Sequence, residues 1–287
     1  FIVSLIIFSM IHFIPGDPAA IMLGRGANPE AVAILRHNLG LDKPVYTQYF
    51  IWLMGVLRGD MGLSYRLKIP VVELVLERYP RTLSLVSVGS IIALLISLSA
   101  GISSAKKQNS WKDLFITTIS LFGISIPSFW LGILLVMLLS VYLGFLPTSG
   151  YVAFNRDFLG WLEHLAMPSV TLGLAVGAIM TRMVRGSLLE VFHQNYIIVA
   201  RSKGLSERLI LYKHCLRNAL LPVITYFGIQ MGYMLGGSVV IEEVFTYPGI
   251  GQLVVDAIFR RDYPLVQAVI LAYAFTFILI NFIVDIS

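Results

Sequence analysis

Residue patterns that perform catalysis are absent from this chain of 287 residues. It contains no GxxxxGK(S/T) phosphate loop, no HExxH zinc motif and no GxSxG nucleophile elbow. The five histidines are scattered, and the single cysteine, Cys215, has no second cysteine with which to form a disulfide or a paired metal site. We therefore expect no catalytic residue, no cofactor-binding residue and no metal site in this chain.

Positive charge is concentrated in residues 182–222, which contain seven basic residues and only two acidic ones, Glu190 and Glu207. The basic residues are Arg182, Arg185, Arg201, Lys203, Arg208, Lys213 and Arg217. A basic interval between apolar segments is typical of a cytoplasmic loop of a membrane protein. Its chemistry is that of binding, not of catalysis.

The spacing within this loop predicts two short helices that meet at a glycine. Tyr196, Ala200 and Gly204 recur every four residues, so they would share one face of the first helix. Gly204 suits the left-handed position that ends a helix. Ser206 can cap a second helix, which would begin with the acidic Glu207. An interfacial amphipathic hairpin would show a similar pattern, whereas a simple connection would not need the bend.

Composition indicates an all-α integral membrane protein. The chain is 57% hydrophobic and 13% charged, with a mean hydropathy of +0.82, whereas soluble domains carry about 25% charged residues. Its net charge of +5 lies mainly in loops beside apolar segments, which favours anchoring at the cytoplasmic side of a bilayer over binding of nucleic acid.

Apolar segments predict about six transmembrane helices. They fall in residues 1–14, 83–105, 114–146, 167–184, 223–244 and 265–284. The first is shorter than the ~20 residues that span a bilayer and would need residues upstream of it. The third should be kinked or interrupted at Pro127. With the lysines near 106–112 and the loop at 182–222 both inside, both termini are expected in the cytoplasm.

Residues 15–79 are expected to form an external segment. It contains turn signals, a short amphipathic helix at 29–39 and an interfacial helix at 46–57. Further along, Gly228, Gly232 and Gly236 would share one helical face, as would Gly173 and Gly177 in an earlier span. Such faces predict close helix packing, with direct contact to a substrate as the alternative.

Two adjacent acids follow the glycine face in sequence. Glu242 and Glu243 lie at the expected end of the fifth span. Because acids at a membrane boundary are costly unless they reach water or a cation, we expect both to be exposed to the outer vestibule.

The loop resembles that of a known family. The run ARSKGLSE at 200–207, followed by His214, LRNAL at 216–220 and Pro222, resembles the EAA-type cytoplasmic loop of permease subunits in binding-protein-dependent ABC importers. The nearest branch is that of peptide, opine and nickel permeases. The resemblance covers nearly the whole chain, including PGDP at 15–18, GDMGLS at 59–64 and RDYP at 261–264. Ser202 and Cys215 stand where alanine is more usual.

The resemblance implies a type I ABC importer permease fold, in which this loop is the coupling helix that sits in a cleft of the ATP-binding subunit. Residues 1–79 would form the first transmembrane helix and the external segment, and 80–287 the permease core, with the coupling loop at 186–222. The residues expected to couple to the ATPase are Tyr196, Val199, Ala200, Arg201, Lys203, Gly204 and Leu205.

The resemblance also implies the partners and the location of the chain. The partners would be a second homologous permease, two ATP-binding subunits that hold ATP and Mg, an external solute-binding protein and the lipid bilayer of the cell membrane, without nucleic acid. The solute stays open among peptides, opine-like metallophores, nickel chelates and glutathione.

Two other classes of protein would show different sequence patterns. An ion-gradient-driven secondary transporter would show more acids within the spans and internal repeats. A membrane scaffold or receptor that transports nothing would not require a structured basic loop.

Overall fold

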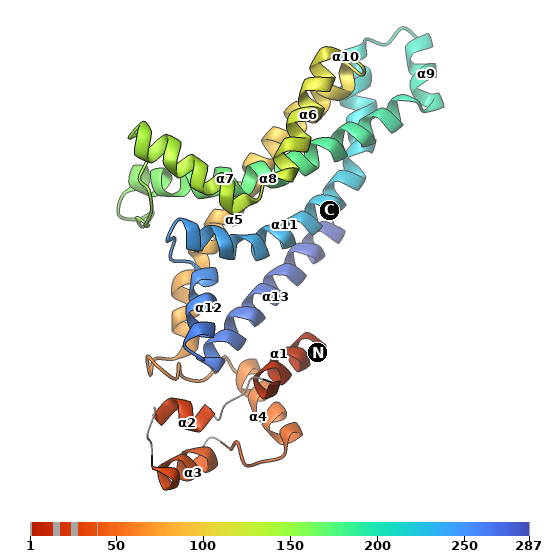
Figure 1. Ribbon diagram of the computed structural model, residues 1–287. Helices are drawn as coiled ribbons and strands as arrows, with labels where there is room; N and C mark the ends of the chain where they lie inside the picture. Colours follow the sequence, from red (N-terminus) through yellow and green to blue (C-terminus); the bar gives the residue numbers. More distant parts are fainter. Residues whose placement is uncertain (1, 14–17, 24–27, 39, 287) are drawn as a thin grey trace. The chain divides into compact units, whose positions relative to one another are not determined.

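The computed structural model describes residues 2–13, 18–23, 28–38 and 40–286, and within these ranges it is helical without a named strand (Figure 1). The chain divides into two compact units, residues 1–81 with 248–276 and residues 82–247 with 277–287. The divisions at 81 and 276 fall inside two long helices, α5 (Val71–Lys106) and α13 (Tyr263–Ile286). The PGDP motif at 15–18 lies outside the described residues, apart from the backbone of Pro18.

The first unit contains five short helices and parts of two longer ones. They are α1 (Ile2–Phe13), α2 (Pro18–Leu23), α3 (Pro29–Asn38), α4 (Val45–Leu57), the start of α5, α12 (Ile250–Phe259) and the first part of α13. Helices α3 and α4 confirm the two short helices expected in the external segment. Ser4 and Tyr49 share a hydrogen bond of 2.9 Å between their hydroxyls, which joins α1 to α4.

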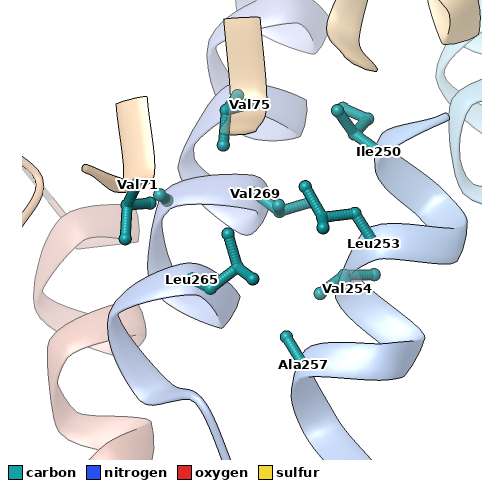
Figure 2. Close-up of a cluster of buried hydrophobic side chains, with 9 residues drawn as sticks. Val71, Val75, Ile250, Leu253, Val254, Ala257, Leu265 and Val269 are labelled. Carbon is teal, nitrogen blue, oxygen red and sulfur yellow. The ribbon is translucent and has the colours of Figure 1, made fainter. Parts of the chain in front are cut away.

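The core of this unit is an apolar cluster where α5, α12 and α13 meet. Ile250, Leu253, Val254 and Ala257 follow the spacing of one helical face, so α12 turns a continuous apolar stripe inward. Figure 2 shows these side chains pointing toward members of the same cluster from α5 and α13. Those members are Val71, Val75, Leu265, Ala268 and Val269.

A buried carboxylate joins two of the sequence motifs in this unit. Asp262 is 3% exposed and accepts hydrogen bonds from the hydroxyl of Ser64 and from the backbone N–H of Tyr65, the latter at 3.0 Å. Burial, together with the negative charge of Asp262, raises the pKa of Tyr65 to about 12. The GDMGLS and RDYP motifs, about 200 residues apart in sequence, are thus in direct contact.

The second unit contains the remaining helices. They are the rest of α5, α6 (Trp111–Ser125), α7 (Ser128–Leu135), the π-helix η1 (Val136–Tyr142), α8 (Phe158–Phe192), α9 (Asn195–Ser202), α10 (Glu207–Leu209), the π-helix η2 (Ile210–Cys215), α11 (Leu216–Val244) and the end of α13.

The described residues contain four helices long and apolar enough to cross a membrane, or five if one bent pair is a single span. The four are Val71–Lys106, Phe158–Phe192, Glu207–Val244 and Tyr263–Ile286, and the pair is Trp111–Ser125 with Ser128–Tyr142. The number is lower than the expected six. The difference lies at 1–14, where α1 has 12 residues, short of the ~20 that a spanning helix needs.

The interruption expected at Pro127 is a bend of 101° between α6 and the following helix. Ile126 has an extended backbone, with φ −83° and ψ 123°, as a residue before proline prefers. Its N–H still bonds to the carbonyl of Phe122 at 3.1 Å, and Pro127 has no N–H that could be left unpaired. The bend therefore leaves neither backbone N–H in need of a partner.

One of the two adjacent acids departs from expectation. Glu242 is fully buried, and its carboxylate accepts a hydrogen bond of 2.6 Å from the hydroxyl of Thr82, whereas Glu243 is exposed as expected. The helical turn explains the difference, because Ser238, Ile241 and Phe245 place the Glu242 face of α11 inward while the next residue points about 100° away. The prediction of exposure was wrong for Glu242.

Glycines bring helices of the second unit close together. A Cβ at Gly173 in α8 would lie 2.7 Å from the carbonyl oxygen of Gly89 in α5, and one at Gly232 in α11 would lie 2.2 Å from Cε2 of Phe277 in α13. At Gly228 the nearest atom, a Cγ of Val284, would be 2.9 Å away. Gly236 differs, because a Cβ there would meet no atom within 4 Å.

The contrast between Gly173 and Gly236 predicts opposite effects of alanine. Gly173→Ala should lower the melting temperature of the purified protein, because the backbones of α5 and α8 must separate, at a cost of roughly 1–3 kcal/mol. Gly236→Ala should leave it unchanged or raise it, since alanine favours a helix by about 1 kcal/mol over glycine. Thermal unfolding in detergent measures both, and an equal effect of the two substitutions would contradict the packing role of Gly173.

Candidate functional site

The basic loop after α8 contains a short helix and a bend at a glycine. The eight-residue helix α9 turns away from the end of α8, and α10 begins a few residues later (Figure 1). Between them Gly204 has φ +76°, in the left-handed region that glycine favours. The prediction is confirmed for the bend at Gly204 and for the short helix before it. It was wrong about the length of the second helix, because α10 is the start of the continuous helix Glu207–Val244.

Hydrogen bonds close the turn at both sides of the glycine. The N–H of Gly204 donates to the carbonyl of Arg201 at 2.9 Å, and that of Leu205 donates to the carbonyl of Ala200 at 3.3 Å. Ser206 accepts a bond from the N–H of Leu209 at 3.4 Å, which is the cap expected for α10. The bend is thus built from backbone bonds and a single capping side chain.

An ion pair crosses the bend. Nε of Arg201 donates to Oε1 of Glu207 at 2.8 Å, and Nη2 donates to Oε2 at 3.3 Å. The guanidinium in α9 therefore binds the carboxylate in α10 through two hydrogen bonds. These hydrogen bonds raise the pKa of Arg201. Both side chains are largely exposed, so the pair adds little to stability. The sequence pattern did not reveal the pair.

The side chains expected to couple to a partner are not equally accessible. Tyr196 and Val199 are 42% and 52% exposed, and Arg201, Lys203 and Gly204 are also exposed. Leu205 is half-buried, while Ala200 is 8% exposed and so packs against the chain itself.

One exposed apolar residue was missed. Ile198 is 54% exposed next to Val199, whereas Ile197 is fully buried. Ile197, Ile198 and Val199 are consecutive apolar residues, so periodicity alone does not show which of them points outward.

A hollow of about 270 Å³ lies beside α9. Its lining includes Ser187 and Glu190 from α8, Gln194 and Tyr196 from the start of α9, and Asn218 and Pro222 from α11. The amide of Asn218 donates to the hydroxyl of Tyr196 at 2.8 Å and to the carbonyl of His214 at 3.2 Å. Tyr196 therefore ties α9 to α11, a connection that the sequence spacing did not predict.

The other singled-out residues lie elsewhere. Gly228, Gly232 and Gly236 are in α11 and do not join the loop. Within the described part of the chain, no group of three or more His, Cys, Asp or Glu side chains is arranged to hold a metal ion. What the loop offers is a shaped, charged and partly apolar surface, suited to contact with another protein.

The chain is a helical membrane protein with an exposed polar loop that a partner could contact. Comparisons with known proteins show to which family of membrane proteins it belongs. Residues 87–287 match the model of the family described as "Binding-protein-dependent transport system inner membrane component", and residues 1–86 match that of its N-terminal part. The chain belongs to this family of inner-membrane components of binding-protein-dependent transport systems.

Curated relatives align along the whole chain. The chain is 43% identical over 286 residues to the "Glutathione transport system permease protein GsiC" of Escherichia coli O6:H1, an alignment that covers 100% of this chain and 91% of that protein. The protein of the same name from Shigella dysenteriae serotype 1 gives the same identity and coverage.

Solved structures confirm the fold. An inward-facing structure of the MetNI methionine ABC transporter matches with a TM-score of 0.62 at 20% identity, over 74% of this chain and 93% of that one. A crystal structure of an amino acid ABC transporter matches with a TM-score of 0.56 at 12% identity, over 75% and 92%. The fold is therefore that of a type I ABC importer permease.

The bond between Tyr196 and Asn218 predicts a local effect of removing one hydroxyl. Tyr196→Phe should loosen α9 by about 0.5–1.5 kcal/mol, seen as roughly 2- to 10-fold faster amide exchange of its backbone. Hydrogen–deuterium exchange with mass spectrometry on the purified protein measures the rate. Tyr212→Phe is the matched control, because Tyr212 is 55% exposed in the same loop; equal exchange of α9 in the two variants would show that the hydroxyl of Tyr196 does not hold the helix.

Proposed function

We propose that residues 196–205 form the coupling element of this permease, which receives an ATP-binding subunit and passes its movement to the spanning helices. The observation that carries the proposal is the hydrogen-bonded bend at Gly204, because an element held by local bonds moves as a unit. Tyr196, Ile198 and Val199 supply apolar contact area on its surface. The turn contains Gly204 and Leu205, and its positive charge comes from Arg201 and Lys203. The buried side chain of Ala200 packs it against the rest of the chain.

The proposed complex contains a second, homologous permease, two ATP-binding subunits and an external solute-binding protein. The family description, which ties transport to a binding protein, supports the last of these. ATP and Mg would be held by the ATP-binding subunits and not by this chain. Closure of those subunits would draw the coupling elements together and switch the permease pair between inward-facing and outward-facing states by rigid-body movement.

The proposed orientation places both termini in the cytoplasm. Lys106, Lys107 and Lys112 lie in or beside the short turn between α5 and α6, and seven basic residues lie in 182–222. Such short, lysine- and arginine-rich connections stay on the inner side of the membrane. Residues 1–79 would then contribute the first membrane helix and an external segment, and 80–287 the core with the coupling loop at 186–222.

The proposed solute is glutathione or another short peptide. The relatives at 43% identity carry the name of a glutathione permease, and their alignment covers all of this chain. Opine-like metallophores and nickel chelates remain within the branch that the sequence resembles, although the reported relatives give them no support. The separate solute-binding protein would supply most of the selectivity.

Purification of the complex tests this function. The tagged chain, extracted from native membranes, should bring with it a second permease and ATP-binding subunits, and its ATPase should rise when the solute-binding protein and glutathione are added. Recovery of the chain alone, with no ATPase in gentle detergent, would favour a gradient-driven carrier or a scaffold. A complex that responds to a different solute would retain the importer and overturn the choice of glutathione.

Gly204 gives a sharper prediction for the coupling element. Gly204→Val places a β-branched residue at φ +76°, which costs roughly 1–2 kcal/mol or more, and so should reduce uptake about tenfold while ATP hydrolysis continues. Uptake by proteoliposomes and release of phosphate are the two measurements.

Gly186→Val is the control for this substitution. Gly186 lies in α8 with open space around its Cβ position, and its backbone is helical. Normal uptake by a stably assembled Gly204→Val complex would contradict the coupling role.

A further inference from the structure

A buried carboxylate joins three helices near the loop. Asp113, in the first turn of α6, is 4% exposed. Its two oxygens accept bonds from Nε of Arg185 at 2.7 Å and Nη2 of Arg185 at 2.8 Å. They also accept bonds from the hydroxyl of Ser104 in α5 and from the N–H of Asn109 at 2.9 Å. One side chain thus holds the end of α5, the turn after it, the start of α6 and the cytoplasmic half of α8.

This pair lies at the end of a close contact between α5 and α8. A Cβ at Gly101 in α5 would be 2.7 Å from Cβ of Val184, the residue that precedes Arg185. The two backbones therefore approach closely up to this point. The next polar link along both helices is the bond of Ser104 and Arg185 to the same carboxylate.

The pair also lies close to the coupling element. Helix α8 continues from Arg185 to Phe192, and α9 begins at Asn195. At 1.5 Å per residue, Arg185 is about 10 Å along the helix from its end. A displacement of α9 therefore reaches Arg185 through two turns of continuous helix.

We propose that Asp113 and Arg185 are positioning residues that make the α5–α6 turn move together with the coupling element. The inference rests on the proposed function of residues 196–205. A guanidinium bound through two parallel bonds resists both rotation and separation. Because the same carboxylate also accepts bonds from Ser104 and Asn109, α6 and the turn before it follow α8 when the coupling element moves.

The surroundings of the pair show that it does not fill an apolar core. A hollow of about 510 Å³ lies against it, lined in part by Asn109, Trp111 and Thr117. Shortening Arg185 therefore enlarges an existing hollow without creating a sealed cavity. The Arg185→Gln variant should fold and assemble.

The test compares uptake and ATP hydrolysis in the complete complex, reconstituted in proteoliposomes with its solute-binding protein. Arg185→Gln and Asp113→Asn should lower the amount of solute taken up per ATP hydrolysed by roughly 2- to 30-fold, while the ATP-binding subunits stay attached. Arg185→Lys, which keeps the charge and loses the paired geometry, should give an intermediate ratio.

The matched control is Arg182→Gln. Arg182 lies three residues earlier on α8, is exposed, and forms no ion pair within the described residues. It removes the same charge from the same helix and should leave the ratio of uptake to hydrolysis as in the wild type.

Each outcome separates this inference from the proposed function. A wild-type complex without ATP-dependent uptake overturns the proposed function itself. If the wild type transports, an Arg185→Gln ratio equal to that of Arg182→Gln overturns the positioning role, as does a parallel loss of uptake and hydrolysis. If Arg185→Gln fails to assemble, Arg185→Lys decides, and an unchanged ratio in that variant overturns the inference.

Discussion

Within the hydrocarbon core of a bilayer no water can satisfy an unpaired peptide group, so each spanning segment must be a helix that satisfies its own backbone. Most features of this chain follow from that constraint. Helices whose surfaces are apolar gain little from burying apolar area against each other in lipid, and close approach of their backbones becomes the main source of attraction. Gly173 against Gly89, and Gly101 against Val184, provide that approach between α5 and α8. At the bend, the N–H of Ile126 still bonds to the carbonyl of Phe122, and Pro127 has no N–H.

The proposed coupling loop is built differently from the spanning helices. Its bend contains one left-handed glycine and a serine cap. Arg201 also bonds to Glu207 across the turn, and Asn218 of α11 bonds to Tyr196 of α9. These contacts are weak one by one because they are exposed. Together they hold the eight-residue helix α9, which would be unstable alone, beside the long helix that begins at Glu207. The result is a surface that presents Ile198 and Val199 outward.

The two regions are connected through α8. This helix packs closely on α5 along its glycines, holds α6 through Arg185, and leads directly into α9. Buried polar side chains such as Asp113 and Glu242 are expensive in this setting unless their bonds are complete. Both accept hydrogen bonds from helices distant in sequence, so they specify which helices are neighbours. A transporter that switches by moving rigid groups of helices needs such specific links, because general apolar packing would allow slippage.

The sequence by itself determined the class, the family, the four spanning helices and the bent pair, and the bend of the loop at Gly204. Those features depend on local order: apolar run length, the position of Pro127, and the succession of Gly204, Ser206 and Glu207. The first expected span was not found at spanning length, and the number of spans is four or five within the described residues. Only the tertiary structure decided which side chains meet. It buried Glu242 but not Glu243, turned Ile197 inward and Ile198 outward, and paired Arg201 with Glu207, Tyr196 with Asn218 and Asp113 with Arg185. The physical reason is that these outcomes depend on the rotation of each helix and on partners up to 160 residues away, which no local spacing encodes.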